Sequence, residues 1–191
     1  RMGIVPDTQS VARFVPSDSI FKLDLCFDIE KLRASLAESL EKVGYANNEW
    51  KAQGFGILPL NHRAGDNDLS ANDLSGRYWM RKDDRYVEEA FEDYVEESAY
   101  TDFDSRFAGT YLEEVYRALC ARFPIGRVRV LSKEVYNCNS WHRDPEPRLH
   151  IPIVSNPGAL FVVNHHVTHL PADGSVYFTD TRGYHTAING G

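Results

Sequence analysis

The sequence predicts a mainly β protein with flanking helices (α+β), whose strands form an antiparallel barrel or jelly roll. Before Pro124, apolar residues recur at the three- and four-residue steps of helices. After Pro124, short β-rich runs alternate with turn signals at residues 156–158 and 173–174, a spacing typical of barrels and jelly rolls. We expect one domain over residues 1–191, with a helical layer within about 28–123 and a β-core mainly in 125–191.

The first half contains two strand patterns and two helix patterns. Residues 21–27 alternate apolar with mostly polar side chains, which predicts a half-buried strand. Asp28 is predicted to cap a helix that ends at Gly44. A further strand is expected at residues 55–60 and a second helix at residues 111–123.

Two polar stretches separate these elements, and a series of strands follows them. Residues 61–76 are rich in turn formers and predict a long loop of the kind that shapes substrate pockets. The acidic residues within 88–97 are interpreted as a solvated helix face. The predicted strands of the β-core are residues 128–131, 134–136, 149–154, 160–163 and 176–178.

Composition excludes several classes of function. The formal charge of -7 gives no overall basic field, so no nucleic-acid partner is expected. No stretch approaches the roughly 20 apolar residues that span a bilayer, so no membrane partner is expected either. Cys26, Cys120 and Cys138 are odd in number and lack CxxC spacing, which indicates three reduced thiols in a cytoplasmic protein.

The stretch with the clearest chemistry surrounds His142 and Asp144. Two residues apart in an extended chain, they leave the same face of a strand and could form two corners of a divalent-metal site. His185, predicted to open a later strand, would complete the two-His-one-carboxylate triad of non-haem iron oxygenases. Such a triad leaves open positions for a chelating co-substrate and dioxygen, whereas structural zinc favours four closed ligands.

A second pair of polar residues follows this motif closely. Arg148 and His150 are also two apart and are expected to share one face of a strand. Arginine is well suited to bidentate carboxylate binding, so this pair beside a metal suits a dicarboxylate.

The ordered set of motifs resembles the aspartyl/asparaginyl β-hydroxylase family, which includes cis-4-proline hydroxylase-like enzymes. The motifs are GRVRVL at residues 126–131, WHRD at 141–144, RLH at 148–150, Gly174 with FTD at 178–180, and HTAIN at 185–189. Trp50 and residues 56–60 also resemble the family's N-terminal strand, and the whole resemblance covers roughly residues 45–191.

The resemblance implies a double-stranded β-helix, a cupin-like jelly roll, that uses Fe(II), 2-oxoglutarate and dioxygen as co-substrate. His142, Asp144 and His185 would be the catalytic metal ligands, and Arg148 and His150 would bind 2-oxoglutarate. The implied reaction hydroxylates an aspartyl, asparaginyl or prolyl side chain, free or within a peptide or protein, and releases succinate and carbon dioxide. The family also has an Arg downstream of the distal His, so we expect the native chain to continue beyond Gly191.

Two other functions remain open at this stage. A cupin-like metalloenzyme would keep the triad without using 2-oxoglutarate. A non-catalytic β-sandwich binding module would use the same histidines structurally. The order of the motifs favours the first interpretation, but fold resemblance alone does not settle chemistry.

Several further polar residues have a structural and a functional interpretation. His165, His166 and His169 are interpreted as a polar turn, with a second metal site as the alternative. Asp180 could cap the turn before His185 or orient a ligand histidine. Arg127 and Arg129 face the same way on a strand and could meet a substrate carboxylate or phosphate, but we expect them to pair inwards with acidic residues of the helical layer. Trp141 is expected to pack in the barrel wall.

Overall fold

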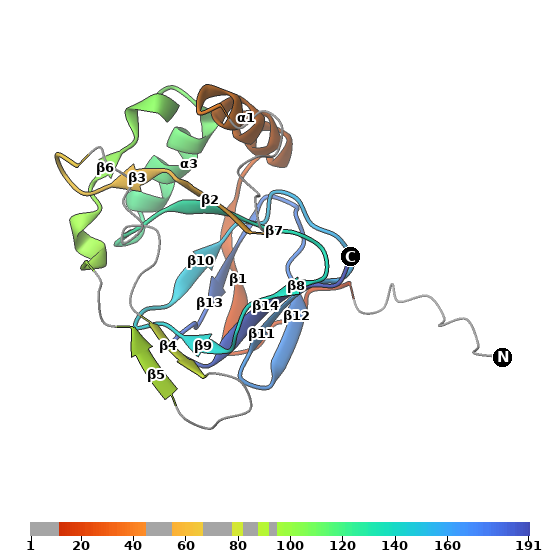
Figure 1. The fold of residues 1–191 in the computed structure, drawn as a ribbon. Helices are drawn as coiled ribbons and strands as arrows, with labels where there is room; N and C mark the ends of the chain where they lie inside the picture. The colour runs from red at the N-terminus through yellow and green to blue at the C-terminus, as the bar shows by residue number, and fades with distance from the viewer. Residues whose placement is uncertain (1–11, 45–54, 67–77, 82–87, 92–94) are drawn as a thin grey trace. The chain divides into compact units, whose positions relative to one another are not determined.

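A computed structural model of the chain describes residues 12–44, 55–66, 78–81, 88–91 and 95–191 (Figure 1). These residues form two compact units. The β unit comprises the described residues of 1–26 and 135–191, and the mixed unit comprises those of 27–134. Strands dominate the described residues and pair antiparallel within each unit, which confirms the prediction of a β-rich chain.

The β unit contains a three-stranded sheet in the order β1-β13-β10. Its strands are β1 (Ile20–Cys26), β13 (Ser175–Thr179) and β10 (Arg148–His150). Along β10 and β13, Arg148 lies opposite Thr179 and His150 lies opposite Tyr177. Residues 148 and 150 therefore share one face of β10, as the sequence predicted.

The second sheet of the β unit has the order β12-β11-β14-β9, and β8 also pairs with β14. The strands are β8 (Asn137–Cys138), β9 (His142–Arg143), β11 (Ala159–Val163), β12 (His166–His169) and β14 (His185–Asn189). β14 lies in the middle of this sheet, so His185 at its start is held by neighbours on both sides.

The core of the β unit draws on both sheets. Ile20 and Tyr177 from the three-stranded sheet pack with Phe161 and Val163 from β11, and Leu170 completes the cluster. These side chains are at most 8% exposed, so the sheets are joined by the removal of apolar surface from water. Phe161 of this cluster lies 5.9 Å from the ring of His185, one of the predicted ligands.

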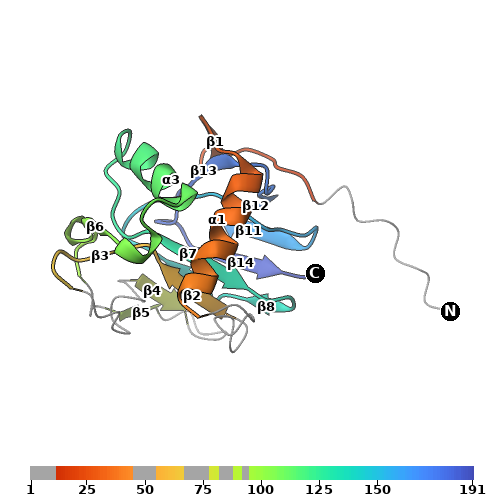
Figure 2. The ribbon, with the colours of Figure 1, turned by 90° about the horizontal axis from the view of Figure 1, so that it is seen from above.

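The mixed unit is built on helices α1 (Ile29–Lys42) and α3 (Tyr111–Cys120), which lie side by side in Figure 2. Its strands form three antiparallel pairs: β2 (Phe55–Pro59) with β7 (Arg129–Lys133), β3 (Asn61–His62) with β6 (Asp102–Phe103), and β4 (Tyr78–Arg81) with β5 (Glu88–Phe91). The unit also contains the 3-10 turns η2 (Glu97–Ala99) and η3 (Ser105–Phe107).

The start and end of α1 follow from its sequence. The Asp28 carboxylate accepts hydrogen bonds from the N–H groups of Glu30 and Lys31, which would otherwise lack partners in the first turn. Gly44, just past the helix, has φ of 79°, a conformation in which glycine has no Cβ to clash. Both boundaries of this predicted helix are confirmed.

Other local predictions were wrong. Residues 134–136 form a turn instead of a strand, and Tyr136 there has φ of 60°. Glu88 and Glu89 are exposed as predicted, but they lie in the strand Glu88–Phe91 and not in a helix. Glu97 is only partly exposed and pairs with Arg127. The predicted loop begins with β3 and a turn, and its residues 67–76 lie outside the described part of the chain. No helix among the described residues is long and apolar enough to cross a membrane.

Candidate metal centre

Strand pairing brings His142 and His185 together. β9 and β14 run antiparallel, and these two histidines are direct cross-strand partners. Cross-strand partners project from the same face of a sheet, so the two imidazoles meet, with ring centroids 4.2 Å apart. The pairing of β9 with β14 thus brings together two residues that are more than forty positions apart in the sequence.

Asp144 is placed by hydrogen bonds just beyond the end of β9. Its N–H donates to the Thr181 carbonyl oxygen at 2.8 Å. The buried Thr181 hydroxyl in turn donates to the Glu146 carbonyl oxygen at 2.7 Å. These two bonds fasten the turn after β9 to the segment that precedes His185, and they leave Asp144 only 6% exposed.

The three predicted ligands therefore converge. One ligand atom each from His142, Asp144 and His185 lies within 4.8 Å of the others. His185 Nε2 is 3.4 Å from Asp144 Oδ2. Among the described residues this is the group of His, Cys, Asp or Glu side chains whose arrangement could hold a metal ion.

Backbone carbonyls set the tautomer of both imidazoles. His142 Nδ1 is 2.7 Å from the Ser140 carbonyl oxygen, and His185 Nδ1 is 3.1 Å from the Gly183 carbonyl oxygen. A carbonyl only accepts, so each Nδ1 carries the proton and each Nε2 keeps its lone pair. A ligand histidine held through its other nitrogen in this way is a general feature of metal centres.

Burial keeps His150 and His185 neutral at neutral pH. Burial, followed by the nearby His142, lowers the pKa of His185 to about 4. Burial, followed by the Arg148 charge, also lowers the pKa of His150 to about 4. A neutral imidazole is the form that binds a metal, so no proton has to leave His185 at neutral pH.

Arg148 and His150 adjoin the triad, as the sequence predicted. Arg148 Nε is 3.0 Å from Asp144 Oδ2, and its terminal Nη2 is 3.1 Å from Glu146 Oε1. The Nε–H is not aligned for a hydrogen bond, so the contact with Asp144 is an ion pair only. Both Arg148 Nε and His150 Nε2 are buried without a hydrogen-bond partner.

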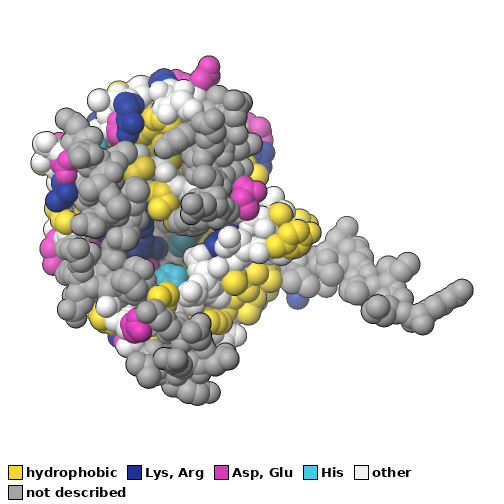
Figure 3. Space-filling view, in the orientation of Figure 1, with side chains coloured by type: hydrophobic (Ala, Val, Ile, Leu, Met, Phe, Trp, Pro, Cys, Tyr) yellow, Lys and Arg dark blue, Asp and Glu magenta, His cyan; other side chains and the backbone are white. Residues whose placement is uncertain are grey.

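These two nitrogens could bind a dicarboxylate. Buried polar atoms are normally hydrogen-bonded, and unmet ones often mark where a ligand or water belongs. Arg148 Nε and the Nε2 of the neutral His150 lie beside three convergent metal-ligating groups. The residues present therefore fit a divalent cation with an anionic ligand next to it. Figure 3 shows His and Lys or Arg side chains close together on the surface.

Three residues that sequence patterns did not single out also shape the site. Phe161 lies 5.0 Å from the His150 ring and 5.9 Å from the His185 ring, and forms an apolar wall. Thr181 fixes the turn after Asp144, and Glu146 holds Arg148. Glu146 could have been found from its place between the two motifs. No local pattern distinguishes Phe161 or Thr181.

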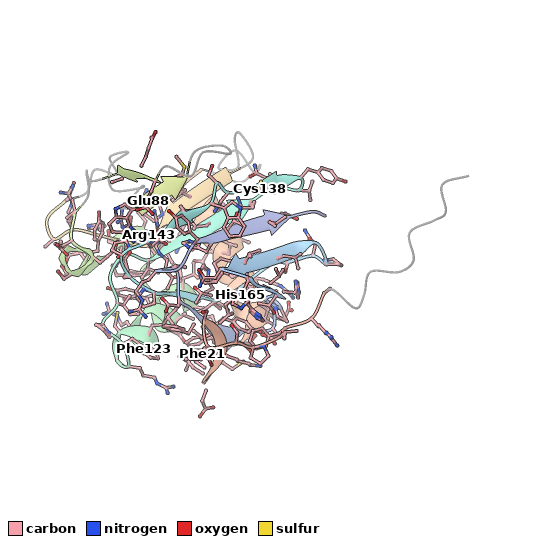
Figure 4. All side chains as sticks on the ribbon, turned by 90° about the horizontal axis from the view of Figure 1, so that it is seen from below. Phe21, Glu88, Phe123, Cys138, Arg143 and His165 are labelled. Carbon is pink, nitrogen blue, oxygen red and sulfur yellow. The ribbon has the colours of Figure 1, made fainter. Side chains whose placement is uncertain are left out.

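The other histidine candidates are not a second metal centre. His165 lies in the turn between β11 and β12, apart from Arg143 of β9 in Figure 4. His166 and His169 belong to β12, which corrects the prediction of a polar turn across all three. His166 Nε2 is 2.7 Å from the Val15 carbonyl oxygen, and His169 Nδ1 is 2.8 Å from that of Ala159.

Two further predictions near the site are resolved. Asp180 binds the backbone N–H and the guanidinium of Arg182, so it stabilises the turn and does not orient a ligand histidine. Arg182 accordingly lowers the pKa of Asp180. Trp141 is 43% exposed, which corrects the prediction that it packs in a barrel wall.

A comparison of the chain with models of known protein families found no match, and a comparison with curated proteins found none either.

Proposed function

We propose that this chain is an Fe(II)- and 2-oxoglutarate-dependent dioxygenase of double-stranded β-helix fold that hydroxylates an amino-acid side chain. The observation that carries the proposal is the convergence of His142, Asp144 and His185 within 4.8 Å, beside the buried nitrogens of Arg148 and His150 that have no hydrogen-bond partner. The two facing antiparallel sheets of the β unit support the fold assignment. The motif order described above supports the choice of co-substrate.

The protein's own groups have separate tasks in this proposal. His142, Asp144 and His185 would hold iron, which when bound supplies the activation of dioxygen that couples oxidation of 2-oxoglutarate to hydroxylation of the substrate. Arg148 would orient a carboxylate of 2-oxoglutarate by charge and hydrogen bonding. The neutral His150 would supply a hydrogen bond without adding charge. Phe161 keeps this side of the site dry.

One observation favours a second candidate function. Arg148 already contacts two carboxylates, Asp144 and Glu146, so its charge is largely balanced without a dicarboxylate. A cupin-like metalloenzyme that does not use 2-oxoglutarate would have the same arrangement. The two candidates differ in whether a keto acid binds next to the metal.

Anaerobic titration of the protein with Fe(II), followed by 2-oxoglutarate, separates the candidates. Chelation of iron by a keto acid produces a visible charge-transfer band. We expect a band in the wild type that is lost in His142→Ala and weakened in Arg148→Ala. His165→Ala, which removes an exposed histidine from a turn, is the matched control and should keep the band. Tight iron binding without a band would favour the cupin-like candidate, and no iron binding would sink both.

A further inference from the structure

The Arg148 guanidinium lies between two carboxylates of unequal burial. Asp144 has a side chain 7% exposed and belongs to the candidate triad, whereas the side chain of Glu146 is 34% exposed. Glu146 Oε1 is 3.1 Å from the terminal Nη2 of Arg148, whose Nε faces Asp144. The outer, more accessible part of the guanidinium is thus the part that Glu146 covers.

Backbone hydrogen bonds hold this arrangement in place. The Thr181 hydroxyl donates to the Glu146 carbonyl oxygen at 2.7 Å, and the Thr179 hydroxyl donates to the Arg148 carbonyl oxygen at 3.2 Å. Both threonines are fully buried. These bonds hold the backbone at both residues, so Glu146 would leave Arg148 by rotation of its side chain.

We propose that Glu146 is a positioning residue that competes with the carboxylate of 2-oxoglutarate for Arg148. The inference rests on the proposed function. Asp144 is buried and serves the metal, so the replaceable partner of Arg148 is Glu146. An incoming carboxylate exchanges one anion on Arg148 for another, and the displaced Glu146 charge remains nearby and opposes binding. Glu146 thereby weakens co-substrate binding and holds Arg148 in place until the co-substrate arrives.

Glu146→Gln tests this competition because it removes the charge and keeps a side-chain oxygen that accepts from Arg148. We measure the dissociation constant of 2-oxoglutarate on anaerobic, Fe(II)-loaded protein, together with that of Fe(II) itself. We expect Glu146→Gln to bind 2-oxoglutarate about two- to fivefold more tightly, the range typical of partly exposed ion pairs. The gain should shrink as salt is added, because salt screens charges at this exposure.

Asp180→Asn is the matched control. It removes one negative charge from the same unit, but that charge pairs with Arg182 and not with Arg148. Its affinity for 2-oxoglutarate should match that of the wild type. An equal gain in both variants would show a general charge effect and overturn the role of Glu146.

The remaining outcomes are distinct. Unchanged or weaker 2-oxoglutarate binding in Glu146→Gln, with a normal wild-type complex, overturns the role of Glu146 and leaves the proposed function standing. A larger change in Fe(II) affinity than in 2-oxoglutarate affinity shows an effect through Asp144 and also overturns it. No wild-type complex at all defeats the proposed function, and this inference with it.

Discussion

Two arginines, one in each unit, show how a structural ion pair differs from a site that can receive a ligand. In the mixed unit, Arg127 has a side chain 3% exposed, its guanidinium donates to Glu97 at 2.7 Å, and it lies 4.7 Å from the centre of the Tyr100 ring. In the β unit, Arg148 is 27% exposed and is shared between Asp144 and Glu146.

The surroundings of Arg127 are closed by packing. Glu97 also accepts the Arg127 backbone N–H at 2.7 Å, so one carboxylate serves both ends of the residue. Glu97 can come this close only because residue 126 is glycine: a Cβ there would lie 2.6 Å from Glu97 Cβ. The predicted inward pairing of Arg127 with an acidic residue is confirmed. Arg148, by contrast, adjoins imidazole nitrogens that keep their lone pairs, so an ion and a ligand can still be added.

The largest expected effect is on the acid stability of the β unit, where both histidines with lowered pKa lie. His150 and His185 have pKa values of about 4 when folded, against 6.5 for an ordinary histidine. Below pH 6.5 the unfolded chain binds protons that the folded chain does not. The free energy of unfolding therefore falls as the pH drops from 6.5 to about 4, by up to about 3 kcal/mol for each residue.

Urea unfolding of the metal-free protein across this pH range measures the acid effect, and amide exchange locates it. Exchange protection should be lost first in β10 and β14. His150→Leu should remove a large part of the dependence of the unfolding free energy on pH, because leucine does not titrate. The prediction would be contradicted by an unchanged pH dependence of the unfolding free energy in this variant, or by a loss of exchange protection that starts in the mixed unit.

The second effect concerns the closed arginine. Arg127→Met should lower the free energy of unfolding by about 3 kcal/mol, because it leaves Glu97 without its buried cation. Arg117→Met is the control, since Arg117 is an exposed helix residue paired with Glu113 and should cost about 0.5 kcal/mol or less. Thermal or urea unfolding measures both. Equal costs in the two variants would remove the contrast between the two arginines.

The third effect concerns the shared arginine. Arg148→Gln should weaken 2-oxoglutarate binding to the Fe(II)-loaded protein about 30-fold, because a charge-assisted hydrogen bond is lost. Its cost to the stability of the metal-free protein should be about 3 kcal/mol, because the buried Asp144 loses its cation. Arg182→Gln, which breaks the exposed pair with Asp180, should leave affinity unchanged. Isothermal titration measures the affinities, and an unchanged affinity of Arg148→Gln for 2-oxoglutarate would contradict our distinction between the two arginines.

The smallest effect tests how the site is held. Thr181→Val replaces a buried hydroxyl by a methyl group and leaves the Glu146 carbonyl without its donor. We expect a loss of about 1 kcal/mol in stability and a fewfold weaker Fe(II) affinity, because Asp144 is less firmly placed. Thr186→Val is the control: its hydroxyl donates to the Asn139 carbonyl oxygen, so stability should fall while Fe(II) affinity changes less. Equal losses of affinity in both variants would argue against a specific role for Thr181.

Local patterns predicted much of the secondary structure because their cause is local. Helix α1 has its cap at Asp28 and its stop at Gly44, both short-range interactions. Strands β11, β13 and β14 lie where β-rich runs predicted them. β12 was missed because its histidines were interpreted as a polar turn, although Val167 and Thr168 are β-branched and the segment pairs with β11.

The errors near the site have the same origin. Residues 134–136 are apolar enough for a strand, but Tyr136 takes a left-handed conformation and its N–H donates to the Asn189 carbonyl oxygen at 2.7 Å. Trp141 is exposed despite its apolar ring. The conformation of Tyr136 and the exposure of Trp141 are therefore decided by contacts with residues distant in sequence, and not by residue type.

The sequence by itself determined which residues could serve as ligands, since spacing by two fixes a shared face for residues 148 and 150 and places Asp144 near His142. It also determined the helices whose caps are local. Only the tertiary structure decided that His185 pairs with His142, that both Nδ1 atoms are held by carbonyls, and that Arg148 is divided between Asp144 and Glu146. The physical reason is that strand register and burial depend on the whole packed unit, whereas spacing and capping depend on a few adjacent residues.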